Sequence, residues 1–429
     1  MASRNGLPAC VAVAFAMLLG GCVAAGGWLR SVEQPLYHNQ PDLALKHLES
    51  AGQKDGVALY LIHKGLLLRM AGDIEGSIAA FEAAKPLITF QEATSISELA
   101  SSLVLTEGLG GYQPPPFEQI QLHFYQALNR LELGDLEGAR VEAMQIDILL
   151  QRRWGGFAPH GADATARYLS GLIFEANGEP DDALIAYRKA YQVYREHGRV
   201  PVDLQRRLLR LAYINGLDAL VQQYLREFGD TRLEEALQML EREQGELVLI
   251  AATGLVPHRR EEVAMHFDPQ LGFSVAMALP ALSFPHDAIA SVAVRHDGRV
   301  LQGDEVLADL AELSGAQLEA EMPALMAKAI ARNVARAIAA REAAEEMGAF
   351  GSFMVNVAGA AMEAADIRSW STLPRHIRVV SVPLAPGTYT GIEVDYHGSN
   401  GHVATQSLGR EIHVRAGMPT IVGVHRVSP

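Results

Sequence analysis

The sequence predicts a mixed α + β chain in which a repetitive helical region precedes a β-sandwich-like region with an inserted helical hairpin. Three observations support this. One helix–turn–helix pattern occurs three times in the first half, the apolar period changes from 3.6 to 2 near Gly245, and an alanine-rich helical stretch, residues 304–366, interrupts the strand pattern. With 429 residues and 49% hydrophobic content, the chain is long enough for more than one packed domain.

The N-terminus has the pattern of a cleaved export signal. Arg4 precedes an apolar run from Val11 to Leu19 that is too short to span a bilayer, and the run ends in Leu19-Gly20-Gly21-Cys22. This stretch resembles the precursors of bacterial lipoproteins. The resemblance implies that residues 1–21 are removed and that Cys22 becomes the lipid attachment site, carrying fatty acids such as palmitate. The alternative is an ordinary secreted protein with a cysteine near its cleavage site.

Residue 23 indicates in which membrane the lipid anchor is expected to lie. The Asp that commonly holds such lipoproteins at the inner membrane of Gram-negative bacteria is replaced by Val23. The resemblance therefore implies an outer-membrane anchor with the protein on the periplasmic side. We expect residues 22–40 to form a tether, residues 41–243 the helical domain and residues 245–429 the β-rich domain.

Charge and cysteine content exclude several classes of partner and site. The formal charge of −14 becomes −15 when Arg4 leaves with the signal, so nucleic acid is not expected as a partner. Of the two cysteines, Cys10 lies in the cleaved segment, so the mature chain has no thiol pair. We therefore expect no disulfide and no cysteine-based metal site.

The helical region is built on a repeated spacing of small residues. Each copy has a small residue, a Gly-acid turn seven residues later and a second small residue in the next helix; the copies start at Gly65, Ala127 and Gly171. This pattern resembles the tetratricopeptide repeat, in which small residues let antiparallel helices approach closely. Gly72, Gly134 and Gly178, the turn glycines, are 62 and 44 residues apart rather than about 34, so extra helices must interrupt the array.

We expect these additional helices at Phe90–Thr106, as a cap at Asp42–Ser50 and as further pairs within 202–242. Two loops between helices carry aromatic residues among Gly and Pro: Tyr112 and Phe117 in one, Trp154 and Phe157 in the other. Exposed aromatics on neighbouring loops are typical of protein-binding sites, so these four are the candidate partner-binding residues. The alternative is that they fold back onto the helices.

The second half alternates short strands with turns. Strands are expected at Leu247–Ala252, Glu262–Phe267, Phe273–Leu279 and Ile289–Arg295, and His296-Asp297-Gly298 predicts a hairpin turn. Residues Val306–Leu313 and Ala316–Ala365 read as helical. Strands resume in five segments: Ile377–Pro383, Tyr389–Tyr396, Val403–Ser407, Glu411–Val414 and Thr420–Val427. Neither group closes a core alone, so one sandwich is expected from strands on both sides of the insert.

The stretch Asp366-Ile-Arg-Ser-Trp-Ser-Thr-Leu-Pro374, with the lipoprotein signal and the repeats, is similar to a family of poorly characterised tetratricopeptide-like bacterial lipoproteins. The resemblance covers nearly the whole mature chain and brings no established activity. We interpret Trp370 as a core residue and Arg368 as the ion-pair partner of an acid such as Asp366. The alternative is a ligand site.

No catalytic motif stands out, since the histidines are scattered and neither Gly-x-Ser-x-Gly nor a phosphate-binding loop occurs. We therefore expect a non-enzymatic scaffold without catalytic residues, metal or cofactor, which contacts the membrane through its lipid and envelope proteins through the helical repeats. The helical insert, alanine-rich from Ala324 to Ala344, is a candidate for self-association. The alternative function is an envelope enzyme or glycan-binding module with its site in the β-rich domain.

Overall fold

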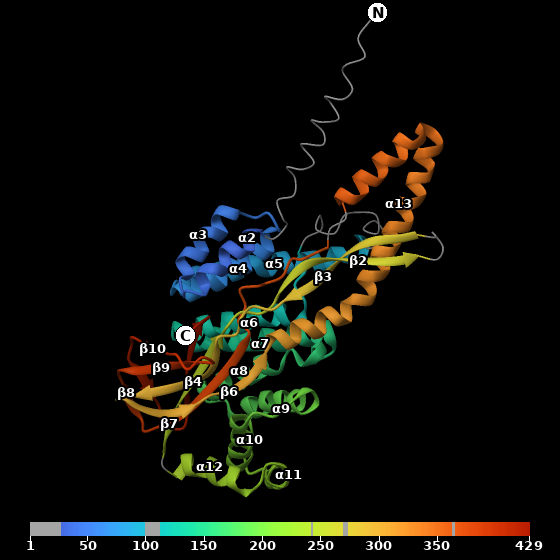
Figure 1. The fold of residues 1–429 in the computed structure, drawn as a ribbon. Coiled ribbons are helices and arrows are strands. Elements are labelled where there is room, and N and C mark those ends of the chain that lie inside the picture. Colours follow the sequence, from blue (N-terminus) through green and yellow to red (C-terminus); the bar gives the residue numbers. More distant parts are fainter. Residues whose placement is uncertain (1–26, 99–111, 242, 269–272, 363–364) are drawn as a thin grey trace, which may run out of the picture.

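The computed structural model describes residues 27–98, 112–241, 243–268, 273–362 and 365–429, and places a helical half beside a β-rich half (Figure 1). Cys22, the predicted lipid attachment residue, lies outside these residues. The helices of the first half are α2 (Gly27–Leu36), α3 (Pro41–Ala51), α4 (Val57–Ala71), α5 (Ile74–Glu98), α6 (Pro116–Glu132), α7 (Leu136–Trp154), the short 3₁₀ helix η1 (Pro159–Gly161), α8 (Ala164–Ala176), α9 (Pro180–His197), α10 (Val202–Ile214), α11 (Asp218–Phe228) and α12 (Asp230–Glu241).

Three helix pairs, α4 with α5, α6 with α7 and α8 with α9, form the tetratricopeptide-like part. The turn glycines have positive φ angles of 88°, 72° and 75°, which favour glycine over other residues. The small residues lie under aromatic rings: a Cβ atom added at Gly65 would be 2.7 Å from the Phe81 ring, and one at Gly171 would be 2.3 Å from the Tyr187 ring. The predicted repeat is confirmed, and its spacing has a steric cause.

Two predictions for this half were wrong. Residues 27–36 of the expected tether form α2, because Val32 and Leu36 are apolar at helical spacing and pack against Leu255 and Val427 from the β-rich half. No separate helix begins at Phe90, because α5 continues without a break to Glu98. Residues 99–106 of that expected helix lie outside the described residues.

The β-rich half contains one sandwich of two four-stranded sheets. Its strands are β1 (Gly245–Thr253), β4 (Ile289–His296), β5 (Arg299–Gly303), β6 (Glu305–Asp309), β7 (His376–Leu384), β9 (Ile392–Gly398), β10 (Val403–Ser407) and β12 (Pro419–Arg426). One sheet has the order β12-β1-β7-β6 and the other β10-β9-β4-β5; β8 (Gly387–Tyr389) pairs with β11 (Ile412–Val414). Both sheets combine strands from before and after the insert, as predicted.

Strand β1 shows how the two halves share a core. All nine of its residues are buried, so both of its faces are covered. Leu247 and Leu249 pack inside the sandwich, whereas Val248 and Ile250 pack with the helices. Helices α6 and α8 lie against β12, and α8 also contacts β6. The helical and β-rich halves therefore form one packed unit rather than two separate bodies.

A two-stranded ribbon and the helical insert both project from this unit (Figure 1). Strands β2 (His258–Asp268) and β3 (Phe273–Ser283) form a two-stranded ribbon outside the sandwich, and α13 (Leu310–Met362) runs beside β3. Figure 1 shows α13 turning back near its far end, as a helical hairpin does. The insert begins later than predicted, because residues 305–309 form β6, in which Glu305 pairs with Val379 of β7.

Candidate interaction surfaces

The four candidate aromatic residues do not share an exposed edge. Tyr112 is 4% exposed and Phe117, which lies in the first turn of α6, is 5% exposed. Both belong to the main core, so their expected exposure was wrong and the fold-back alternative applies to them. Trp154 is half-buried against the same core. Phe157 remains 41% exposed, with the guanidinium carbon of Arg167 5.0 Å from its ring centroid.

The motif at residues 366–374 is structural, as predicted. Trp370 is buried between Phe81 and Tyr125, with ring centroids 5.8 and 6.3 Å away. The Nη2 atom of Arg368 lies 2.6 Å from Oδ2 of Asp366. The motif thus connects the helix pairs to the strand region by core packing.

Glu118 of α6 secures this motif and was not anticipated from the sequence. The backbone N–H of Trp370 donates to its Oε1 atom at 3.0 Å, and the Tyr112 hydroxyl donates to Oε2. Burial raises the pKa of Glu118 to about 7, although both hydrogen bonds act in the opposite direction. In the sequence, Glu118 resembles an ordinary exposed acid in the first turn of a helix, so no local pattern predicts that it is buried.

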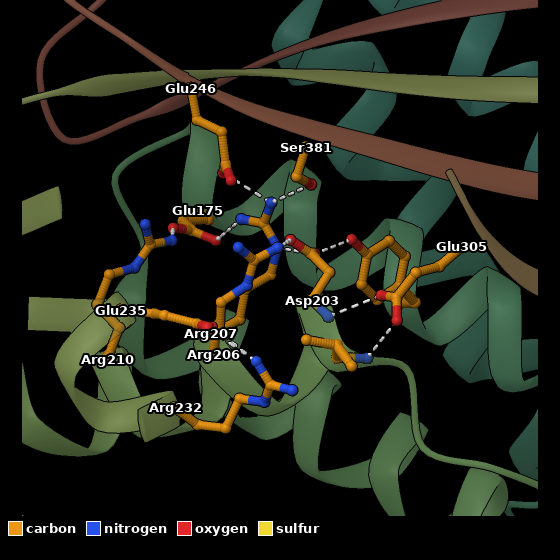
Figure 2. Close-up of polar contacts among 12 residues, drawn as sticks. Glu175, Asp203, Arg206, Arg207, Arg210, Arg232, Glu235, Glu246, Glu305 and Ser381 are labelled. Carbon is orange, nitrogen blue, oxygen red and sulfur yellow. Dashed lines mark hydrogen bonds and ion pairs between the residues drawn. The ribbon is translucent and has the colours of Figure 1, made fainter. Parts of the chain in front are cut away.

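A buried network around Arg207 joins α10 to α8 and to the sheet (Figure 2). Arg207 is 2% exposed and donates to Asp203 at 2.6 Å, to Glu246 of β1 at 2.6 Å and to Glu175 of α8 at 3.1 Å. Glu305 of β6 accepts from the backbone N–H groups of Val202 and Asp203, both at 2.9 Å, at the start of α10.

The charges in this network compensate one another. Arg206 and Arg210 pair with Asp203 and Glu175, so three arginines face the three carboxylates around Arg207. Burial raises the pKa of Asp203, but Arg207 and Arg206 outweigh it and hold the pKa below its usual range. Burial raises the pKa of Glu246 despite Arg207. A balanced, fully packed network of this kind fixes one geometry of the helix–sheet junction.

The sheet packs against the face of the helical array that is formed by the first helix of each pair. Twelve of the 17 residues of α6 and 12 of the 13 residues of α8 are buried, because these helices lie between the sheet and the second helices of their pairs. A repeat array of this type commonly binds partners on such an inner face. Here the inner face is occupied by the chain itself, whereas no other described element covers the outward face of α7 and α9.

The outward face contains a groove of about 230 Å³ between α7 and α9, with α8 as its floor. Met144 and Ile148 of α7 and Ile185 of α9 are exposed along it, and Val141 is exposed one turn before Met144. These aliphatic side chains have no covering element among the described residues. The groove is therefore an exposed apolar stripe on a rigid pair of helices.

An ion pair spans the groove. Lys189 of α9 lies 2.7 Å from Oδ1 of Asp147 of α7, and Arg167 of α8 lies 3.2 Å from the same oxygen. Burial raises the pKa of Asp147, but its contacts to Lys189 and Arg167 outweigh burial and lower the pKa. Because Arg167 also lies beside Phe157, the exposed aromatic residue stands at the border of this groove.

Two further grooves adjoin this one. Ile148 also lines a groove between α5, α6 and α7, and Ile185 and Lys189 also line a groove between α9 and α11. The basic residues that line the three grooves are Lys85, Arg152, Arg153, Arg167, Arg188, Lys189 and Arg195, and the acidic ones are Asp147 and Asp182. The combined lining of the three grooves, which we call the outer groove surface, is thus predominantly basic in a chain of net charge −14.

In the part of the chain that the structure describes, no group of three or more His, Cys, Asp or Glu side chains is placed to hold a metal ion. None of the described helices is long and apolar enough to cross a membrane.

No family model matches the chain, and no curated protein matches it in sequence. Some solved structures match part of it. MamA, residues 41 to the end, from Desulfovibrio magneticus RS-1 is 14% identical; the match covers 49% of this chain and 93% of that one, with a TM-score of 0.31. A Podosopora anserina putative kinesin light chain with nearly identical TPR-like repeats is 13% identical over 49% and 93%, with a TM-score of 0.32. Scores this low support no inference about function, and the repeat assignment rests on the helix pairs described above.

Proposed function

We propose that this chain is a lipid-anchored interaction protein of the bacterial cell envelope that binds a protein partner on its outer groove surface. The observation that carries the proposal is the row of exposed aliphatic residues on α7 and α9, which lies on the face that the sheet leaves open. The proposed partner segment is an amphipathic helix with acidic residues. Apolar residues at helical spacing would fill the stripe, and acidic ones would meet the basic residues that line the two adjoining grooves.

The lipid anchor is supported by the run from Val11 to Leu19 and by Leu19-Gly20-Gly21-Cys22. The absence of an acid at position 23 supports the outer membrane, periplasmic side, as its location. Helix α2 begins at Gly27, only a few residues after Cys22, so the folded unit would stay close to the membrane.

The anchor is tested with Cys22→Ser. In cells fed an alkyne-labelled fatty acid, the wild-type chain should carry the label and fractionate with outer membranes, whereas Cys22→Ser should lose both the label and the outer-membrane location. An unlabelled wild-type product, or Cys22→Ser that is still labelled or still fractionates with outer membranes, would contradict the proposed anchor.

The groove is tested with a photo-crosslinking amino acid at position 144 or 185. Both positions should give the same adduct in intact cells, and the same amino acid at Leu43 on α3, also exposed, should not. Because Arg188 and Arg195 line the adjoining α9–α11 groove of the outer groove surface, Arg188→Glu with Arg195→Glu should reduce the yield at least about fivefold, and salt should weaken binding of the purified partner. Equal yields at positions 43 and 144, or insensitivity to the charge changes, would refute the assignment.

A further inference from the structure

We propose that the cleft where the ends of α4 and α6 meet strand β12 binds an oxyanion group, a carboxylate or a phosphate. The cleft has a volume of about 280 Å³ and is lined by Arg69 of α4, Glu132 of α6, Arg410 after β10, and Gly423 and His425 of β12. It lies at the junction of the helical and β-rich halves, separate from the outer groove surface. The proposal does not depend on the lipid anchor or on the protein partner.

Arg69 is the first element of the site. It is 9% exposed, and its Nη1 donates to Asn129 Oδ1 at 2.6 Å. Among the described residues, no carboxylate lies within ion-pair distance of its guanidinium, although a buried arginine usually has such a partner. Arg69 therefore brings a positive charge into the cleft that no direct ion pair neutralises.

Gly423 makes room for this guanidinium. A Cβ atom at residue 423 would lie 2.4 Å from Arg69 Nη2, so any other residue there would displace the arginine. Strand β12 therefore leaves room for the guanidinium of Arg69 directly above its backbone at residue 423. This close approach explains why a glycine interrupts the apolar pattern of β12 at that point.

Arg410 and Glu132 set the net charge of the cleft. The two guanidinium nitrogens of Arg410 lie 2.5 and 3.1 Å from the two carboxylate oxygens of Glu132. This bidentate pair is neutral as a unit, so the cleft with Arg69 has a net charge of about +1. A single anionic group would balance it.

His425 supplies a further hydrogen-bonding group. Both of its ring nitrogens are buried, and within the described residues neither has a hydrogen-bond partner. Burial and, to a smaller extent, the nearby Arg69 lower the pKa of His425 to about 3, so the ring is neutral at neutral pH and carries one N–H donor. Unsatisfied buried donors are rare in folded proteins, and an oxyanion in the cleft would be an acceptor for this one.

The site is tested by calorimetric titration of the folded chain with sodium phosphate and, separately, with sodium acetate, each against sodium chloride at equal ionic strength. Glu132→Gln should tighten binding about tenfold, because it leaves Arg410 without its neutralising partner. Arg69→Gln and Gly423→Ala should weaken binding about tenfold or more. Glu137→Gln, an exposed acid on α7, is the matched control and should leave binding unchanged.

The two arms separate the ligand classes. Binding of phosphate alone assigns a phosphate site, binding of acetate alone assigns a carboxylate site, and binding of both assigns a general oxyanion site. Because Arg69→Gln removes a buried cation and can unfold the chain, Glu132→Gln is the deciding variant. No heat beyond that of chloride, or a Glu132→Gln affinity equal to that of Glu137→Gln, overturns the proposal.

Discussion

Glu118 gives the sharpest test of the energetics, because its carboxyl group is buried with a pKa raised to about 7 from the ordinary 4.5. In the unfolded chain the group ionises near pH 4.5, whereas in the folded chain it keeps its proton to about pH 7. The folded state therefore binds more protons between these values, and its stability falls as the pH rises through this window. A shift of about 2.5 pH units corresponds to about 3 kcal/mol lost by pH 8, with less than about 1 kcal/mol lost by pH 5.

Glu118→Gln removes this penalty while keeping the shape and an acceptor for the Trp370 N–H. We expect the variant to be about 2–3 kcal/mol more stable than wild type at pH 8 and nearly equal at pH 5. For a folded chain of about 400 residues this is a rise in Tm of roughly 3 °C at pH 8, from the usual entropy of unfolding per residue.

The assay is thermal unfolding by circular dichroism and calorimetry at pH 5, 6, 7 and 8. Glu137→Gln, an exposed acid at the start of α7, is the control and should show no such pH trend. If Glu118→Gln destabilises the protein equally at pH 5 and pH 8, Glu118 is not an acid held neutral by burial, and the reasoning fails.

Two further changes test the packing. Gly171→Ala places a Cβ atom 2.3 Å from the Tyr187 ring and should cost about 1–3 kcal/mol in urea unfolding, whereas Gly198→Ala, with open space and an extended φ of 176°, should cost less than about 0.5 kcal/mol. Equal effects would remove the steric explanation of the repeat. Arg207→Met leaves three buried carboxylates without their central cation and should cost about 3–5 kcal/mol at pH 7. The loss should shrink toward pH 5, since burial already raises the pKa of Glu246 and protonation removes its charge; a constant loss across this range would show that the carboxylates are not the cause.

Local patterns predicted the helix pairs well, because their determinants lie close together in sequence. Gly65 and Phe81, or Gly171 and Tyr187, are sixteen residues apart, and the intervening turn glycine fixes how the two helices meet. The strands on either side of the insert were also predicted, since alternation is a local property. The boundary at residues 305–309 was missed because β6 becomes a strand by pairing with β7, more than sixty residues away.

The candidate sites depended on distant contacts and were predicted less well. Tyr112 and Phe117 lie among Gly and Pro, as exposed loop aromatics do, yet both are buried in the main core. The Tyr112 hydroxyl donates a hydrogen bond to Glu118. Phe157, from the other loop, stays exposed beside the outer groove surface. Nothing in the sequence distinguishes these loops, because the difference lies in which part of the chain packs over each.

The sequence by itself determined the repeated helix pairs, the change to strands at Gly245 and the core role of Trp370, since each depends on periodicity or on neighbouring residues. The lipoprotein-like N-terminus stays a prediction from the sequence. Only the tertiary structure decided which face of the helices is open, because β12 covers α6 and α8 and leaves α7 and α9 exposed. Only the tertiary structure brought Arg69, Arg410 and His425 to one cleft. The physical reason is the same in both cases: burial and net local charge are set by segments hundreds of residues apart, which no local pattern encodes.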